Sequence, residues 1–368
     1  MITREPAFYS SFRCTGGACP LTCCRDWDIV LDDNAIADYA AAPEGLRQLI
    51  AENLVTDEDG DVCFRLRPDG LCALLDGDGL CPIQRHWGEE HLCGHCGAYP
   101  RFIEEYGCLT ERCQAVSCPE AARLVLERGI FPLAETDDGI ADQPFDGVDG
   151  RLLDFLTAAR QRALAILNRS DASLWRRLAA LLRDAEAAQD AIDWSKTDNF
   201  QPETPEFDEI PHNLTTLRPL AARLLEALPD LDPLRPEWPA LLRRRASELR
   251  ALDDASYADL AARYDDARPE WPFHLKRLAE YFVFRHYPKA VNDDGLYPRA
   301  AVTAAACAAL HHLAMLEWRE HGALSDADEA LLWARFSREV EHLDENFFAL
   351  AEALSDIDVW PLVEMLEN

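Results

Sequence analysis

Residues 14–27 read CTGGACPLTCCRDW and place four cysteines within eleven positions. Of the 13 cysteines in the chain, twelve lie between residues 14 and 118, and only Cys307 lies beyond them. In the same region glycine, proline and cysteine interrupt every apolar run before it reaches the length of a helix. The sequence therefore predicts a small irregular domain that depends on a bound metal for its order.

The secondary structure expected within this region is short. Two strands are predicted at 62–66 and 71–75, joined by a turn around 68–70. One helix is predicted at 83–91 and another at 119–128.

Beyond residue 150 the pattern changes to that of amphipathic helices. The run LLDFLTAARQRALAIL at 152–167 repeats apolar side chains at the spacing of one helical face, and so does 174–182. Further helices are predicted at 213–228, 238–252, 256–266, 273–286, 297–320 and 326–354. The predicted fold is therefore mainly α: a small irregular Cys-rich metal-binding domain with short strands and a helix, followed by an α-helical bundle.

Composition divides the chain into three parts. Residues 1–133 form the Cys-rich metal domain, and 134–150 form an acidic linker without apolar periodicity. Residues 151–368 form the α-helical domain, with a further linker near 194–211 that is rich in Pro, Glu and Asp.

The charge of the chain excludes two classes of partner. With 36 basic and 67 acidic residues the net charge is -31, which repels phosphate backbones and anionic lipid headgroups. We therefore expect no binding to nucleic acid or to a membrane surface.

The start of the chain lacks the features of a secretory signal, so a cytoplasmic location is expected. The most apolar stretch, 300–316, falls short of the roughly 20 strongly apolar residues that a membrane span needs. In a reducing cytosol, dense cysteines indicate metal binding or redox chemistry rather than disulfides.

The cysteines fall into three sequence groups. They are Cys14, Cys19, Cys23 and Cys24; Cys72, Cys81, Cys93 and Cys96; and Cys108, Cys113 and Cys118. Thiolates at such spacing suit an iron-sulfur cluster or zinc. The adjacent pair Cys23–Cys24 either serves two different metals or includes a structural thiol. Two sites of four ligands, or one cluster with surplus thiols, both fit the count.

Three polar residues accompany these cysteines. His95 lies between Cys93 and Cys96 and is either a nitrogen ligand or a solvated side chain. Tyr99 and Arg101 are candidate cofactor-binding residues, because an Arg there holds an anionic group or neutralises a thiolate-rich cluster. A surface ion pair is the simpler role for Arg101.

Ordered motifs along the chain carry a family resemblance. They are Phe12-Arg13-Cys14, Cys23-Cys24-x2-Trp27, Cys72-Ala73-Leu74-Leu75, Cys96-x2-Tyr99-Pro100-Arg101, Ser117-Cys118-Pro119-Glu120, Tyr281-x2-Phe284-Arg285 and Ser337-Arg338-x2-Glu341-His342. Taken together, they resemble the flagellin lysine N-methylase family, within the broader group of zinc- or iron-chelating cysteine-cluster proteins. The extra cysteines at 63, 93, 108 and 113, and Tyr281 in place of an expected Asn, depart from the family pattern.

The resemblance implies a cytoplasmic enzyme that moves a methyl group from S-adenosylmethionine to lysines of flagellin or another lysine-bearing protein. It also implies an iron-sulfur cluster, most simply 4Fe-4S, with zinc as the alternative. The metal ligands that it implies are Cys14, Cys19, Cys23, Cys24, Cys72, Cys81, Cys96 and Cys118.

Four residues of the helical part are candidates for the chemistry. N-methylation requires a neutral amine, so Glu341 or His342 is a candidate to accept its proton. Tyr281 and Arg285, four residues apart on one helical face, are candidates to bind a carboxylate such as that of methionine. Helix packing explains these residues almost as well.

Two other functions fit the sequence. The chain has no glycine-rich strand-to-helix turn that would cradle the adenosyl cofactor, which favours a non-catalytic zinc- or iron-binding interaction protein. The surplus thiols favour a metal carrier or redox sensor. The sequence leaves the oligomeric state open.

Overall fold

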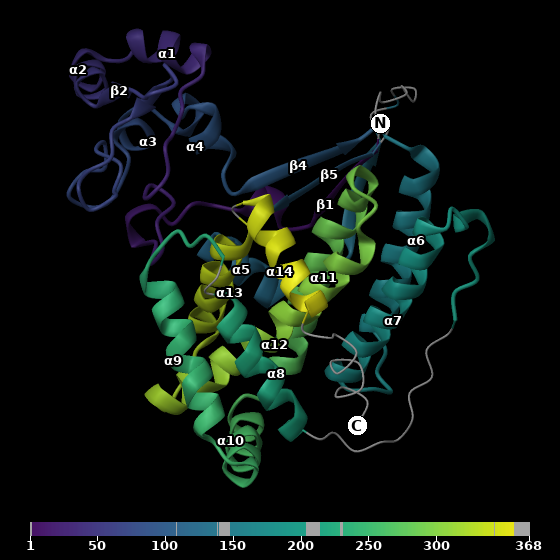
Figure 1. Cartoon of the computed structure of the whole chain (residues 1–368). Coiled ribbons are helices and arrows are strands. Elements are labelled where there is room, and N and C mark those ends of the chain that lie inside the picture. The colour runs from purple at the N-terminus through teal and green to yellow at the C-terminus, as the bar shows by residue number, and fades with distance from the viewer. Residues whose placement is uncertain are drawn as a thin grey trace.

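The computed structural model describes residues 2–107, 109–137, 139, 148–203, 214–228, 231–341 and 343–356. Most of these residues are helical, which confirms the predicted mainly α fold. Figure 1 shows a helical body with a small sheet along one side and a small lobe that projects from it. The lobe contains α1 to α4 and the short strand β2.

The sheet has four strands in the order β4-β5-β1-β6. The strands are β1 (Ile2–Pro6), β4 (Arg101–Tyr106), β5 (Leu109–Gln114) and β6 (Leu133–Asp137). β1 pairs parallel to β5 and antiparallel to β6, while β4 and β5 pair antiparallel. This sheet was not predicted, because its outer strands carry charged side chains, and backbone hydrogen bonds rather than an apolar pattern define them. β6 begins just before the segment assigned to the acidic linker and extends into it.

The small lobe combines one two-stranded sheet with four short helices. They are β2 (Leu54–Thr56), β3 (Val62–Phe64), α1 (Asp33–Ala40), α2 (Glu44–Glu52), α3 (Pro82–His86) and α4 (Gly94–Ala98). β3 confirms the strand predicted at 62–66, but the strand predicted at 71–75 is wrong. Cys72 makes only an isolated bridge to Leu66, because the chain turns at 72–75, where the Leu75 amide donates to the Cys72 carbonyl oxygen at 3.1 Å.

The helix predicted at 83–91 is interrupted. α3 ends at His86, and a separate 3-10 turn, η3, covers Glu89–His91. Between them Gly88 has a φ of 122°, which favours glycine and breaks the helix. Helices α1 and α2 were not predicted either, since each is only about two turns long. The Asp32 carboxylate caps α1 by accepting a hydrogen bond from the Ala35 amide at 2.9 Å.

The helices of the body agree closely with the prediction. They are α5 (Pro119–Arg128), α6 (Gly150–Leu167), α7 (Leu174–Asp193), α8 (Leu214–Ala227), α9 (Glu237–Ala251), α10 (Asp254–Ala267), α11 (Trp271–His286), α12 (Leu296–His321), α13 (Asp326–Glu341) and α14 (Asp344–Asp356). Short 3-10 segments lie at η1 (Tyr9–Ser11), η2 (Gly16–Ala18), η4 (Thr197–Asn199) and η6 (Tyr287–Asn292). The single helix predicted at 326–354 is two helices, and the acidic first turn of α14 favours a new start there.

The buried apolar residues form two separate cores. The smaller core lies wholly within the lobe and includes Ile29, Tyr39 and Ile83. The larger core joins the helices to β5 and α5, through residues such as Val116 and Leu124. The region with its own core therefore covers about residues 29–96, and the end of the Cys-rich segment packs as part of the helical body.

α12 is the central helix of the body. It is long and apolar enough to cross a membrane by length and composition, but 94% of its apolar window is buried inside the protein. A core helix has these properties, which matches the prediction that this stretch is not a membrane span. It carries a buried histidine, His312, whose Nε2 lies 2.8 Å from the Tyr257 hydroxyl.

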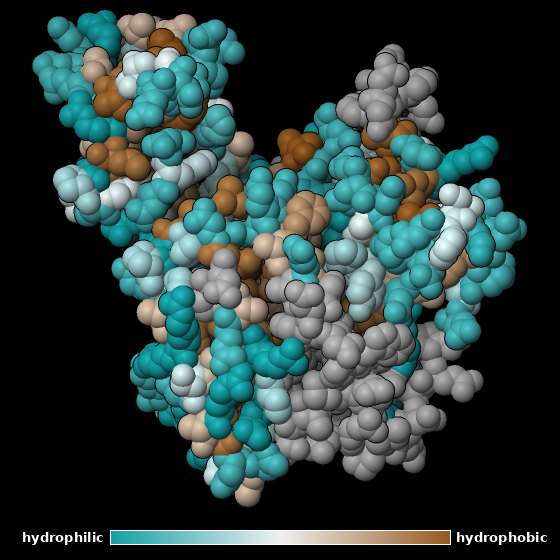
Figure 2. Space-filling model, viewed as in Figure 1, coloured by the Kyte–Doolittle hydropathy of each residue, from teal (hydrophilic) through white to brown (hydrophobic). Residues whose placement is uncertain are grey.

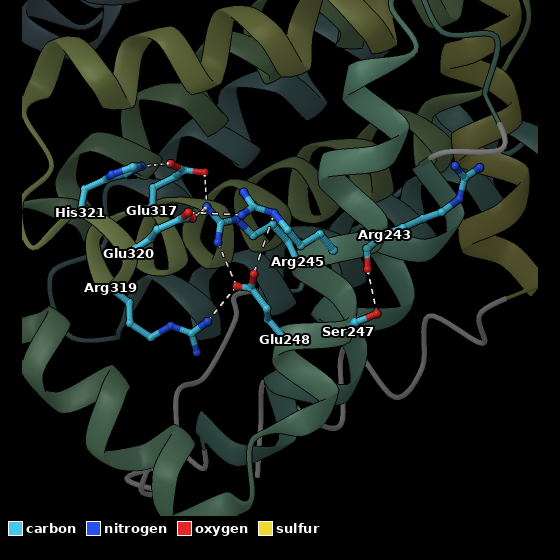
Figure 3. Close-up of polar contacts among 9 residues, drawn as sticks. Arg243, Arg245, Ser247, Glu248, Glu317, Arg319, Glu320 and His321 are labelled. Carbon is cyan, nitrogen blue, oxygen red and sulfur yellow. Dashed lines mark hydrogen bonds and ion pairs between the residues drawn. The ribbon is translucent and has the colours of Figure 1, made fainter.

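A network of ion pairs fixes α9 against α12. Figure 3 shows the Arg245 guanidinium among the carboxylates of Glu248, Glu317 and Glu320. The Arg245 side chain is only 1% exposed, and its distances to Glu248 and Glu317 are 2.9 and 2.6 Å. Since the carboxylates satisfy a nearly buried charge, the network specifies how the two helices pack.

Candidate metal centre

Five chain segments bring eight cysteines to two adjoining cavities between the lobe and the body. Four of these thiols come from the loop before α1, one from the turn after β3, and three from positions at or near the starts of α3, α4 and α5. They are Cys14, Cys19, Cys23, Cys24, Cys72, Cys81, Cys96 and Cys118. The structure thus brings together every cysteine that the family resemblance implied.

The two cavities share some thiols and differ in others. The larger one, of about 120 Å³, is lined by Cys72 and Cys96, which do not reach the smaller one. The smaller one, of about 70 Å³, is lined by Cys19 and Cys118, which do not reach the larger one. Four further thiols line both: Cys14, Cys23, Cys24 and Cys81.

Close packing of two loops brings the first cysteines near Cys81. A Cβ atom on Gly17 would lie 2.0 Å from the Asp78 carbonyl oxygen, so only glycine allows this approach. The loop that carries Cys14 and Cys19 therefore rests on the turn that leads to Cys81.

Two of the cavity thiols lie directly before a helix. Cys81 and Cys118 are the N-cap residues of α3 and α5, and each is followed by a proline. Burial is the main influence on both thiols and raises their pKa values, and the backbone amides of the following turn act in the opposite direction. Neither sulfur accepts a capping hydrogen bond from its helix.

Most of the cavity thiols are desolvated. Burial raises the pKa of Cys72 to about 11 and that of Cys118 to about 11. By contrast, a hydrogen bond from Cys23 lowers the pKa of Cys24 to about 7, and the Arg338 guanidinium contributes in the same direction. A buried group of thiolates needs a compensating cation, which a metal supplies.

Tyr99 and Arg101 also line the larger cavity, as a cofactor role requires. Burial raises the pKa of Tyr99 to about 12, and its hydroxyl lies 3.1 Å from the Ser117 hydroxyl. The Tyr99 ring lies 6.3 Å from that of Trp27, and the Arg101 guanidinium lies 5.3 Å from the centre of the Phe12 ring. This wall offers aromatic faces beside a positive charge.

The spacing of the sulfurs suits a cluster better than a single ion. A tetrahedral zinc with Zn–S bonds of 2.3 Å holds its sulfurs about 3.8 Å apart. Among the described residues, two groups of three donor atoms lie within 4.8 Å of one another, and neither includes a cysteine. An iron-sulfur cluster places several atoms between its thiolates, so the residues present fit that group.

Those two groups of close donors are already neutralised by arginine. His274, Asp326 and Glu329 surround Arg268, which pairs with Asp326 and Glu329 at 2.8 Å. The other group, Glu317, Glu320 and His321, belongs to the Arg245 network of Figure 3.

The residues predicted for the chemistry form a buried network away from these cavities. The Glu341 carboxylate lies 3.1 Å from Arg285 and 3.0 Å from His286, and it accepts a hydrogen bond from Ser337 at 2.6 Å. Arg285 donates to the Tyr281 hydroxyl at 2.6 Å. His342, the fourth candidate, lies outside the described residues.

The charge on Glu341 is strongly held. Burial acts to raise the pKa of the Glu341 carboxyl group. The Arg285 guanidinium and the hydrogen bonds from His286 and Ser337 outweigh burial and lower this pKa to about 2. Burial lowers the pKa of His286 to about 4. Glu341 is therefore ionised and paired at neutral pH, and in this structure it acts as a structural counterion.

The remaining cysteines that the structure describes lie outside the walls of both cavities. Cys63 contacts Asp57, Cys113 is fully buried in β5, and Cys307 is buried in α12. Cys93 is hydrogen-bonded to Cys96, and Cys108 lies outside the described residues. His95 Nδ1 lies 3.1 Å from the Val30 carbonyl oxygen, and its side chain lines neither cavity.

Sequence reasoning gave no role to Arg338, although one of the quoted motifs contains it. Its guanidinium donates to the carbonyl oxygens of Thr22, Leu21 and Ser117 at 3.0, 3.1 and 3.2 Å. These carbonyls flank Cys23 and Cys118 in the chain, and Arg338 itself lines the smaller cavity. One residue of α13 thus joins the helical body to two cysteine segments.

Comparisons with known proteins place this arrangement in context. A model of the FliB lysine N-methylase C-terminal domain matches residues 160–367. The flagellar biosynthetic protein FliU of Salmonella muenchen is 30% identical over 130 residues, which are 33% of this chain and 75% of that protein. The lysine-N-methylases of Salmonella typhimurium and Salmonella choleraesuis are each 27% identical over 195 residues, 50% of this chain. That alignment covers 47% of each lysine-N-methylase, about half its length. No solved structure matches the chain.

Proposed function

Because this chain belongs to the FliB lysine N-methylase family, we propose that it transfers a methyl group from S-adenosylmethionine to the side-chain amine of a lysine. The acceptor is flagellin or another lysine-bearing protein in the cytoplasm. The reaction uses an iron-sulfur cluster that the eight cavity-lining cysteines hold. The observation that carries the proposal is the convergence of those eight thiols on two adjoining cavities.

The chain's own groups prepare the cluster site. Arg338 adds a fixed positive charge beside Cys24, which acts to lower the pKa of that thiol. An iron-sulfur cluster, when bound, supplies one-electron chemistry and iron that binds anionic groups.

The aromatic wall of the larger cavity is the proposed place for the reactive end of the donor. A sulfonium is a cation and is attracted to the faces of Trp27 and Tyr99, and Arg101 pairs with the methionine carboxylate. The cavity volume of about 120 Å³ is below the 300 Å³ or more that organic ligands usually occupy. The adenosine part of the donor therefore lies outside this cavity.

Methyl transfer itself is a substitution at carbon. The lone pair of a neutral lysine amine forms the new N–C bond, the bond from the methyl carbon to sulfur breaks, and S-adenosylhomocysteine leaves. The amine then loses its extra proton to a base or to water. Enclosure by Trp27, Tyr99 and Phe12 keeps bulk water from the reacting atoms.

Charge and shape support a lysine-bearing acceptor. The net charge of -31 attracts cationic segments over a long range. Figure 2 shows a notch between the lobe and the helical body, with hydrophilic side chains along much of it. We propose that the acceptor approaches through this notch.

The test is a methyl-transfer assay with anaerobically purified protein, flagellin and S-adenosylmethionine labelled with carbon-13 in its methyl group. We expect labelled N-methyl-lysine by peptide mass spectrometry, and none when the lysines of flagellin are blocked by acetylation. The variant Cys72→Ser should lose most activity, whereas Cys63→Ser, a buried cysteine outside the cavity walls, should retain it. A protein that binds zinc and transfers no methyl group would instead support the non-catalytic interaction protein.

A further inference from the structure

The loop between β5 and α5 ends at Cys118, and hydrogen bonds of its backbone hold it in place. The Ala115 amide donates to the Pro100 carbonyl oxygen at 2.7 Å, and the Cys118 amide donates to the Ala115 carbonyl oxygen at 3.1 Å. Between them, the Val116 amide donates to the hydroxyl of Tyr281 on α11 at 3.2 Å. Cys118 lines the smaller cavity, so these bonds determine where its thiol enters that cavity.

Tyr281 reaches this loop from a distant part of the chain. Tyr281 and Val116 are both fully buried, so water does not replace the hydrogen bond between them if it is lost. The Tyr281 hydroxyl also accepts a hydrogen bond from the Arg285 guanidinium at 2.6 Å. A hydroxyl oxygen has two lone pairs, and these two donors use both of them. A phenylalanine ring would fill the same space and accept neither bond.

A buried ion-pair network fixes the direction of the Tyr281 hydroxyl. Arg285 pairs with Glu341 at 3.1 Å, and the Ser337 hydroxyl donates to Glu341 at 2.6 Å. The Arg285 guanidinium also lies 4.6 Å from the centre of the Phe102 ring. Because Arg285 is held by both a carboxylate and an aromatic face, its bond to Tyr281 has little freedom. Three of the residues predicted for the chemistry thus form one chain of contacts that ends at the cysteine loop.

We propose that Tyr281 is a positioning residue of the metal centre, which acts on Cys118 through the Val116 amide. Arg285 and Glu341 orient its hydroxyl, and none of these three side chains lines either cavity. A loop that is fixed in advance loses little conformational freedom when its thiol binds the metal. The inference rests on the proposed function in taking Cys118 as a metal ligand, and it does not depend on methyl transfer.

The test compares two substitutions that each remove one buried tyrosine hydroxyl. Tyr281→Phe loses the bond to the cysteine loop, whereas the control Tyr257→Phe loses a bond of 2.8 Å to His312 within the helical body. Release of iron to a chelator is followed by absorption on the full-length protein after anaerobic reconstitution. We expect release from Tyr281→Phe to be about tenfold faster than from the unaltered protein, the effect of one lost hydrogen bond. The absorption spectrum of the bound centre should change in this variant as well, and Tyr257→Phe should alter neither measurement.

A second comparison shows whether the effect passes through Cys118. In the variant Cys118→Ser, the addition of Tyr281→Phe should not accelerate iron release further, because the thiol on which Tyr281 acts is already absent. If Tyr281→Phe fails to fold, as judged by circular dichroism, the milder Ser337→Ala takes its place. That substitution loosens Glu341 and should accelerate iron release by a smaller factor.

Equal iron release from Tyr281→Phe and Tyr257→Phe would overturn the proposal, and so would an effect of Tyr281→Phe that persists without the Cys118 thiol. A protein that binds no metal would overturn it too, whereas bound zinc would keep the same comparison with zinc release as the measurement. Faster metal release without any methyl transfer would contradict the proposed function alone. Methyl transfer together with unchanged metal release would contradict this inference alone.

Discussion

Arg338 joins helix α13 to two of the segments that carry cavity cysteines. Replacing it with alanine removes three charge-assisted hydrogen bonds to the carbonyls of Leu21, Thr22 and Ser117. We expect a loss of about 2 kcal/mol or more in unfolding free energy and faster release of iron to a chelator. Arg338→Lys should recover only part of the lost stability and iron retention, because a single ammonium group cannot reproduce the several hydrogen bonds of the guanidinium group. The exposed Arg335 of the same helix provides the control Arg335→Ala; equal iron release from both variants would contradict this role.

A substitution at Glu341 distinguishes a structural role of this carboxylate from a catalytic one. Glu341→Gln keeps the side-chain volume but removes the carboxylate that pairs with the buried Arg285 charge. The free energy of unfolding, measured by urea denaturation, should therefore fall by about 3 kcal/mol. Glu352→Gln, at an exposed position of α14, should change stability little. Unchanged stability together with lost methyl transfer would show instead that Glu341 takes part in the chemistry.

α12 makes the stability of the body dependent on pH. His312 Nδ1–H donates to the Ala308 carbonyl at 2.7 Å and Nε2 accepts from Tyr257, so both nitrogens are satisfied in the neutral ring. Burial lowers the pKa of His312 from 6.5 to about 4. The unfolded chain therefore takes up a proton at a higher pH than the folded one, and stability is lost as pH falls from 6.5 towards 4.

The expected loss through His312 is about 3 kcal/mol at or below pH 4, at about 1.4 kcal/mol per pKa unit. Urea unfolding at several pH values measures it. His312→Gln should flatten the dependence, although His311, whose pKa burial also lowers, keeps part of it. His86→Gln, at an exposed site of the lobe, serves as control. A pH dependence identical in all three proteins would refute the explanation.

At the scale of elements, periodicity predicted the long helices well. From α8 to α12 the boundaries lie within two residues of the predicted ones, since long amphipathic repeats leave little ambiguity. The strands β1 and β6 escaped prediction because their pairing joins residues 2–6 to residues 133–137, a contact that no local pattern contains. Cysteine spacing identified the metal residues, but which thiols share a cavity depends on how the loop at Gly17 packs on Asp78.

At the scale of the whole molecule, the two separate cores predict that the fold of the lobe depends on the metal more than the fold of the helical body does. The lobe has a small core of its own and meets the body at the cysteine cavities. Most residues of the helical core lie away from the walls of those cavities. Removing the metal should therefore expose the lobe to protease, with cleavage within about residues 29–96 and an intact helical body. Limited proteolysis followed by mass spectrometry measures this. Equal cleavage rates with and without metal would contradict it.

The central claim is that the metal-loaded thiols are required for lysine methylation. The most direct measurement is the methylation of flagellin by one anaerobic preparation, divided into a metal-loaded half and a half stripped of metal by a chelator. Both halves receive S-adenosylmethionine, and circular dichroism confirms that the helical body is intact in each. The account predicts N-methyl-lysine from the loaded half alone, with activity restored on reconstitution. Equal methylation by both halves would contradict it.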